Sequence, residues 1–121
     1  MANPKLICVI EDDEAVRAST GVLLEALGYR FVGFDSAESF LAAGPVEADC
    51  LILDYRLHTL SGMELLELLR ARGVKTPAII VSDVSNHLAA RAARAGVMAM
   101  LRKPLAGDAV AQWLEEIFKD S

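Results

Sequence analysis

The chain has 121 residues, 54% of which are hydrophobic, and its formal net charge at pH 7 is −5. A chain of this length and composition can bury a core as one domain without disulfides or structural metal, which excludes a disordered protein. Its apolar residues form short runs, none near the roughly 20 residues of a membrane span, and its acidic balance disfavours binding to nucleic acid phosphates. Acids follow the first apolar run at once, unlike in a cleavable signal peptide. We therefore expect a single domain over residues 1–121, located in the cytoplasm, that binds neither membranes nor nucleic acids directly.

Five short apolar runs alternate with longer amphipathic stretches along the chain. Runs of this length, several of them rich in Val and Ile, predict buried parallel strands. Two of the runs contain the cysteines Cys8 and Cys50, which we expect to be buried, inert thiols and not a disulfide or metal ligands. The predicted strands are Leu6–Ile10, Arg30–Phe34, Cys50–Leu53, Ala78–Val81 and Val97–Leu101.

Apolar residues recur at helical spacing between these runs, and polar caps or glycines mark the ends of the predicted helices. In chain order the helical stretches are the pattern from Val16 to Leu27, ended by Gly28; a helix through Leu41, capped by Asp35 or Ser36; the pattern from Met63 to Leu69, ended by Gly73; His87–Ala95, capped by Asn86 and ended by Gly96; and a last helix that opens at Asp108 or the turn before it and carries Val110, Trp113, Leu114, Ile117 and Phe118.

Alternation of strands and helices predicts a doubly wound α/β domain, in which a five-stranded parallel sheet has helices on both faces. The predicted strand order is 2-1-3-4-5, as in flavodoxin-like folds. In such sheets the functional residues gather at the carboxyl ends of the strands, near the switch in strand order. The residues that follow each predicted strand are therefore the first candidates for a site.

Polar side chains follow four of the five predicted strands. They stand at the same end of the predicted sheet, so we expect them to converge although they come from separate segments. These residues are Glu11, Asp12 and Asp13 after the first strand, Asp54 after the third, Ser82 after the fourth, and Lys103 followed by Pro104 after the fifth.

The chemistry of this set follows from its charges. Crowded carboxylates repel one another unless a cation lies among them, and hard oxygen ligands suit Mg²⁺. Lys103 adds a positive charge and Ser82 a hydroxyl donor, both suited to phosphoryl oxygens, and the Asp54 carboxylate is the natural nucleophile. Each signal alone has an ordinary explanation, such as a solvated helix start, a turn residue or a surface lysine. Their agreement at four strand ends predicts a phosphoacceptor site that uses Mg²⁺.

With these residues in place, the sequence resembles the response-regulator receiver domain of bacterial two-component signalling over essentially the whole chain. Gly62 matches the glycine that opens the third helix of that family. The segment DSAESFL is similar to receivers of the subgroup that often carries a helix-turn-helix output domain. The motifs that carry the resemblance are VIEDD at the first strand end, LILDYRLHTLSGMELL around Asp54, IIVSD at the fourth strand and RKP at the fifth.

The resemblance implies a role for each matching residue. Asp54 would be the phosphorylation site, Lys103 would contact the phosphoryl group and Ser82 would supply the switch hydroxyl. Asp12, Asp54 and the backbone carbonyl of Arg56 would bind Mg²⁺ directly, and Glu11 would act through water. The acidic pair falls on Glu11 and Asp12 because Arg17 stands where a basic residue commonly follows in the first helix, and the bond from Lys103 to Pro104 is often cis in the family.

The resemblance also implies partners. A histidine kinase or a histidine phosphotransfer protein would donate the phosphoryl group, and the acyl phosphate would later hydrolyse without turnover of any external substrate. Phosphorylation would change the surface of the last two helices and the fifth strand. A downstream protein or an output domain outside these residues would receive the signal. Helical spacing predicts that most of the apolar stripe of the last helix is core, and a residue at its rim, such as Trp113 or Leu105, is either part of that core or forms a homodimer or partner surface.

Three positions depart from the family pattern. Met100 stands three residues before the lysine, where Phe or Tyr is usual, so the conformational readout differs while the chemistry survives. His58 stands where proline is common, and it is either a tolerated loop substitution or a pH-sensitive group beside the site. Asp83 follows Ser82, where small residues are common, and it either repels an incoming phosphoryl group or points to solvent.

Three alternative functions stay open at this stage. A flavin or nucleotide-binding domain of the same architecture would carry a glycine-rich or hydroxyl-rich loop after the first strand, and here that loop is acidic. An aspartyl-phosphate phosphohydrolase would carry a second acid two residues after the nucleophile, where this chain has Arg56. A degenerate receiver would signal without phosphate, against which Asp12, Asp54, Ser82 and Lys103 all argue.

Overall fold

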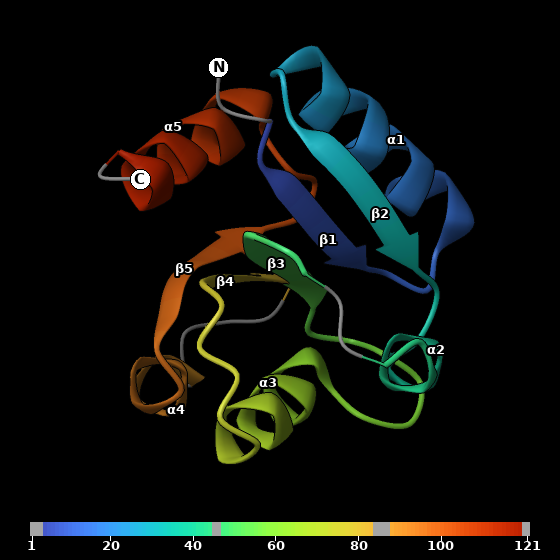
Figure 1. The fold of residues 1–121 in the computed structure, drawn as a ribbon, viewed down its shortest axis with the longest axis vertical. Coiled ribbons are helices and arrows are strands. Elements are labelled where there is room, and N and C mark those ends of the chain that lie inside the picture. Colours follow the sequence, from blue (N-terminus) through green and yellow to red (C-terminus); the bar gives the residue numbers. More distant parts are fainter. Residues whose placement is uncertain (1–3, 45–46, 84–87, 120–121) are drawn as a thin grey trace.

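The computed structural model describes residues 4–44, 47–83 and 88–119 of the chain (Figure 1). Strands and helices alternate along the sequence, as the apolar runs predict. The elements are β1 (Leu6–Ile10), α1 (Glu14–Ala26), β2 (Arg30–Phe34), α2 (Ala37–Ala42), β3 (Cys50–Asp54), α3 (Gly62–Ala71), β4 (Ala78–Ser82), α4 (Ala89–Arg94), β5 (Val97–Arg102) and α5 (Gly107–Phe118).

The strands form one parallel sheet in the order β2-β1-β3-β4-β5, which confirms the predicted fold class and strand order. Figure 1 shows α1 and α5 on one face of this sheet and α2, α3 and α4 on the other. The chain order reverses between β1 and β3, so the carboxyl ends of these two strands mark the switch point where such folds bind their ligands.

The two faces of the sheet bury separate apolar clusters. Alternate residues of a strand point to opposite faces, so Leu51 and Leu53 of β3 pack toward α2 and α3 while Cys50 and Ile52 pack toward α1 and α5. Cys8 and Cys50 are both fully buried free thiols, as the sequence predicts. The central strands are thus covered on both faces, and only their ends are open to function.

Local capping explains where several helices begin and end. The side chain of Ser36, one of the two predicted caps, accepts a hydrogen bond from the backbone N–H of Ser39 at the start of α2. Ser61 and Glu64 form a reciprocal capping box at the start of α3. Gly28 and Gly73, the predicted stops of α1 and α3, have φ angles of +93° and +84°, which favour glycine.

Three strands are one residue longer at their carboxyl ends than predicted. β3, β4 and β5 extend to Asp54, Ser82 and Arg102, because backbone pairing continues through polar residues: Asp54 pairs with Val81, and Ser82 with Arg102. The polar residues at these ends are therefore held by the sheet itself. The predicted start of the fourth helix, with Asn86 and His87, lies outside the described residues, and the described part of α4 begins at Ala89.

Candidate functional site

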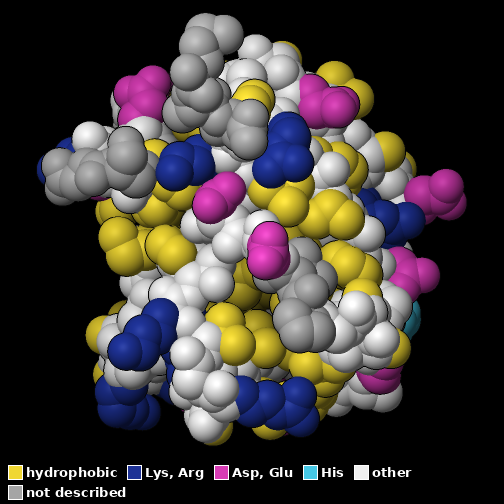
Figure 2. All heavy atoms as spheres, in the orientation of Figure 1, with side chains coloured by type: hydrophobic (Ala, Val, Ile, Leu, Met, Phe, Trp, Pro, Cys, Tyr) yellow, Lys and Arg dark blue, Asp and Glu magenta, His cyan; other side chains and the backbone are white. Residues whose placement is uncertain are grey.

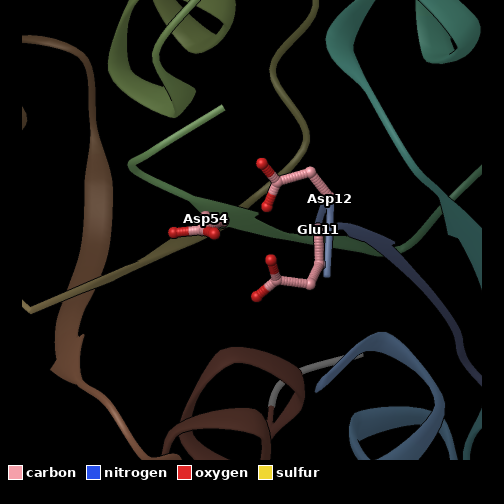
Figure 3. Close-up of side chains that lie close together, drawn as sticks. All are labelled: Glu11, Asp12 and Asp54. Atoms are coloured by element: carbon pink, nitrogen blue, oxygen red, sulfur yellow. The ribbon is translucent and has the colours of Figure 1, made fainter. Parts of the chain in front are cut away.

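Three carboxylates meet at the carboxyl edge of the sheet, between the ends of β1 and β3 (Figure 3). One ligand atom from each of Glu11, Asp12 and Asp54 can be chosen so that all three lie within 4.8 Å of one another. Glu11 and Asp54 are only 4% exposed, and Asp12 is partly buried. The predicted convergence of the acids after the first and third strands is therefore present in the structure.

The turn after β1 is held in place by one backbone hydrogen bond and one hydrogen bond from a side chain. The N–H of Glu11 donates to the carbonyl of Phe34 at the end of β2, and Nη1 of Arg17 donates to the carbonyl of Glu11 over 2.8 Å. Asp13 turns away from the cluster and caps α1, because its Oδ1 accepts from the N–H of Val16. Of the three acids after β1, Glu11 and Asp12 thus lie in the cluster with Asp54, and their role as the acidic pair stays a prediction.

Lys103 follows the end of β5. Among the described lysines, it is the one whose ammonium contacts this cluster. Its Nζ lies 2.9 Å from Asp54 Oδ2 and 3.2 Å from Glu11 Oε1. The peptide bond between Lys103 and Pro104 is cis, and the N–H of Lys103 donates to the carbonyl of Ser82. Ser82 itself is buried as the last residue of β4, so predicted site residues at the ends of four strands share one edge of the sheet.

The electrostatics of the cluster follow from its burial. Burial raises the pKa of Glu11 to about 7, and hydrogen bonding with the Asp54 carboxyl and the charge of Asp54 act in the same direction. Burial by itself would lower the pKa of Lys103, but its contacts with Asp54 and Glu11 outweigh that effect and raise the pKa. A single ammonium thus balances two buried acids and a third nearby, so the site favours additional positive charge.

The donor set of this cluster fits a hard divalent cation. Glu11, Asp12 and Asp54 offer carboxylate oxygens that are close enough together to share one ion. Oxygen ligands of this kind, with room for water in the remaining positions, suit Mg²⁺. The predicted further ligand, the carbonyl of Arg56, belongs to the loop after β3, and the N–H of Arg56 donates to Asp54 Oδ1 over 3.1 Å.

The loop after β3 folds back tightly on the end of the strand. A Cβ atom at Gly62 would lie 2.3 Å from the backbone oxygen of Asp54, closer than any real contact, so only glycine fits there. The N–H of Gly62 also donates to the carbonyl of Tyr55 over 2.9 Å. Gly62 therefore fixes the distance between α3 and Asp54.

Two of the departures from the family pattern lie at the mouth of the site. The side chain of His58 is 81% exposed, and its Nε2 lies 3.4 Å from Asp12 Oδ2. The pH sensitivity of His58 stays a prediction. Asp83 forms an ion pair, because its Oδ1 lies 3.0 Å from Nε of Arg56. It is therefore neither directed to solvent alone nor an unpaired charge facing Asp54. This ion pair joins the loops after β3 and β4 and was not predicted from the sequence.

Other predicted positions lie beside the site. Met100 in β5 is partly buried and packs against the core on the α3 and α4 face. Val110 and Leu114 of α5 are fully buried, whereas Trp113 and Leu105 are partly buried against the same cluster, so most of the predicted stripe is core. A homodimer through Trp113 or Leu105 stays a prediction.

A cavity of about 520 Å³ adjoins the acid cluster between α1 and the loop that joins β5 to α5. Glu11, Asp54 and Lys103 line this cavity together with apolar side chains such as Val16 and Leu105. Figure 2 shows that side chains of both charges occur on the face viewed there, with hydrophobic side chains between them. The buried carboxylate of Asp54 thus lies at the wall of a cavity and not on the open surface.

A five-stranded parallel sheet with acids at its switch point and a lysine after its last strand defines the class of the protein. Residues 7–115 match the response regulator receiver domain family, and the chain belongs to this family. Membership in this family excludes the two alternative classes of protein considered from the sequence, a nucleotide-binding domain and a phosphohydrolase. Within the described residues, no helix is long and apolar enough to cross a membrane.

Similar proteins include transcriptional regulators and solved receivers. The transcriptional regulatory protein FixJ of Azorhizobium caulinodans is 40% identical over 98 residues, which cover 79% of this chain and 46% of that protein. The structure of the response regulator StyR is 32% identical, with a TM-score of 0.84, and the match covers 98% of this chain and 60% of StyR. A CheY-like receiver domain from Methanospirillum hungatei is 26% identical with a TM-score of 0.82, and the match covers 98% and 99% of the two chains. The chain spans about half the length of the curated FixJ and TdiR regulators that it matches.

Proposed function

We propose that this receiver domain is a phosphoacceptor switch in which Asp54 takes a phosphoryl group from the phosphohistidine of a kinase or a phosphotransfer protein. The observation that carries this proposal is the position of Asp54. Its carboxylate is buried at the switch point of the sheet, 2.9 Å from the ammonium of Lys103 and beside Glu11 and Asp12. An acid in such a place is a nucleophile with its charge partners already assembled.

The acidic cluster would hold Mg²⁺. Asp12 and Asp54 would bind the ion through their carboxylates, the Arg56 carbonyl would be a further ligand, and Glu11 would act through water. When bound, Mg²⁺ supplies positive charge that offsets the charge on the phosphoryl oxygens. The ion also balances the excess of acids that Lys103 alone leaves at this edge of the sheet.

The transfer step uses groups that the structure brings together. An oxygen of Asp54 attacks the phosphorus of phosphohistidine as the P–N bond breaks, and the imidazole leaves with the electron pair and takes up a proton. Lys103, freed from its contact with the Asp54 carboxylate, pairs with a phosphoryl oxygen, and the hydroxyl of Ser82 donates to another. Water later hydrolyses the acyl phosphate and restores the carboxylate, so no external substrate is turned over.

The output of the switch would be a changed surface. The new charge of nearly −2 at Asp54 attracts the hydroxyl of Ser82 at the end of β4. This movement alters the surface formed by α4, β5 and α5. Because the chain spans about half of the regulators related to it, we propose that it passes the signal to an output domain in a longer protein or to a separate partner. It would not bind nucleic acid directly.

Phosphorylation by a small donor tests the proposal. The protein is incubated with acetyl phosphate and Mg²⁺, and the intact mass is measured. We expect wild type to gain the mass of one phosphoryl group, and Asp54→Asn to gain none. Asp13→Asn is the matched control, since asparagine also caps a helix and this variant should be phosphorylated like wild type. Phosphorylation of Asp54→Asn to the same extent would overturn the proposal.

A further inference from the structure

An ion pair joins the two loops that flank Asp54. Nε of Arg56, in the loop after β3, lies 3.0 Å from Oδ1 of Asp83, the first residue after β4. Both residues are direct neighbours of the site, because the N–H of Arg56 donates to Asp54 Oδ1 and Asp83 follows the buried Ser82. The pair therefore lies at the mouth of the site and not on a remote surface.

This ion pair is suited to opening, because it is weakly held. The side chains of Arg56 and Asp83 are 66% and 56% exposed, and exposed pairs of this kind contribute little to stability. A phosphoryl group on Asp54 would bring nearly two negative charges next to the pair. That charge attracts the guanidinium of Arg56, whose planar fork matches phosphoryl oxygens, and so competes with Asp83 for it.

We propose that Arg56 and Asp83 form a charge gate for phosphotransfer. In the resting protein Asp83 retains the guanidinium of Arg56, and during transfer Arg56 leaves Asp83 and pairs with the phosphoryl oxygens. The inference rests on the proposed function of Asp54 and adds two residues that set its rate. It also changes the expected role of Asp83, which acts by competing for Arg56 and not by direct repulsion of the phosphoryl group.

The two roles of Asp83 predict different results in a double-mutant cycle. If Asp83 acts by retaining Arg56, its removal matters only while Arg56 is present. If Asp83 repels the phosphoryl group directly, its removal speeds phosphorylation equally with or without the Arg56 side chain. Residues in one ion pair couple in this way, whereas independent residues have additive effects.

The experiment measures the initial rate of phosphorylation by acetyl phosphate at saturating Mg²⁺ in wild type, Asp83→Asn, Arg56→Gln and the double variant. We expect Asp83→Asn to be about two- to fivefold faster than wild type, the change that the opening of an exposed ion pair allows. Arg56→Gln should be slower than wild type, and the double variant should be as slow as Arg56→Gln. Equal acceleration by Asp83→Asn in both backgrounds, or no acceleration in either, would overturn the proposal.

Three further measurements keep the interpretation specific. Glu116→Gln removes a carboxylate on α5 from another exposed ion pair, that with Lys119, and should leave the rate unchanged because it lies away from the site. Mg²⁺ affinity, measured by calorimetry, should be the same in Arg56→Gln and wild type, since only the side chain is altered; a loss of affinity would assign Arg56 to ion binding instead. The acceleration in Asp83→Asn should shrink as salt screens the pair.

The failure of the proposed function would give a different result. In that case wild type itself gains no phosphoryl mass, whereas the failure of the charge gate alone would appear as additive effects in the double-mutant cycle.

Discussion

The Nζ atom of Lys103 lies 2.9 Å from Oδ2 of Asp54, although the two residues are 49 positions apart in the sequence. The same ammonium lies 3.2 Å from Glu11 Oε1. Lys103 therefore compensates two buried acids at once before any ligand arrives. The same contact places a mobile cation where a phosphoryl group on Asp54 would extend.

Loss of this ammonium should destabilise the protein in the absence of divalent ions. Lys103→Ala leaves Glu11 and Asp54 buried without their cation, and we expect the free energy of unfolding to fall by about 1–3 kcal/mol, less than for a fully buried pair because Lys103 is partly exposed. Urea unfolding without Mg²⁺ measures the change. Lys119→Ala removes a lysine from an exposed ion pair with Glu116 of α5 and should cost at most about 1 kcal/mol. Equal losses in the two variants would contradict the compensating role of Lys103.

Mg²⁺ should stabilise the folded protein through the acid cluster. A ligand that binds only the folded state adds about 1.4 kcal/mol at roughly ten times its Kd. We expect the melting temperature of wild type to rise with Mg²⁺ concentration, and that of Asp12→Asn to rise much less. Sodium chloride at matched ionic strength is the control for screening. A rise of the same size in Asp12→Asn would remove Asp12 from the proposed ligands.

The close approach of Gly62 to Asp54 predicts a large effect of a single methyl group. Gly62→Ala would place Cβ against the backbone oxygen of Asp54, so the loop after β3 must move, at a cost of about 1–3 kcal/mol. Gly107→Ala is the matched control, because the atom that its Cβ would approach is the flexible tip of Leu23, at 3.1 Å. We expect it to change stability by no more than about 0.5 kcal/mol. Chemical denaturation of both variants measures this difference in stability. An unchanged free energy of unfolding in Gly62→Ala would show that the loop after β3 can move without cost.

The two cysteines should be unreactive in the folded protein and should make its stability depend on alkaline pH. Burial raises the pKa of Cys8 and of Cys50 to about 12, so both thiols stay protonated at pH 8 and should react with a disulfide reagent only after unfolding. In the unfolded chain each thiol titrates near its ordinary pKa of 9.0.

The sign of the pH effect follows from this difference. Above pH 9 the unfolded state loses thiol protons that the folded state keeps, so stability is fully present below that pH and is lost between pH 9 and about 12. The slope should approach about 1.4 kcal/mol per pH unit for each thiol. A Cys8→Ala, Cys50→Ala double variant should show a shallower decline. A decline of unchanged slope would assign the effect to other groups.

Periodicity and capping in the sequence were sufficient to predict most of the architecture. Each of the five strands begins at its predicted residue, because apolar runs and their polar boundaries are local features. Functional residues gather at the carboxyl ends of parallel strands, and this rule was sufficient to predict that Glu11, Asp12, Asp54 and Lys103 lie close together. The strand ends were predicted one residue short, since pairing with a neighbouring strand, and not polarity, decides where β3, β4 and β5 stop.

The amino-acid sequence by itself determined which chemical groups reach the edge of the sheet, because strand periodicity and strand ends depend on neighbouring residues. Only the tertiary structure decided how those groups are paired. The contact of Arg17 with the Glu11 carbonyl, the sharing of Lys103 between two acids and the ion pair of Arg56 with Asp83 all depend on side-chain geometry between separate segments. Burial, which raises the pKa of Glu11, likewise exists only after the sheet has closed around it.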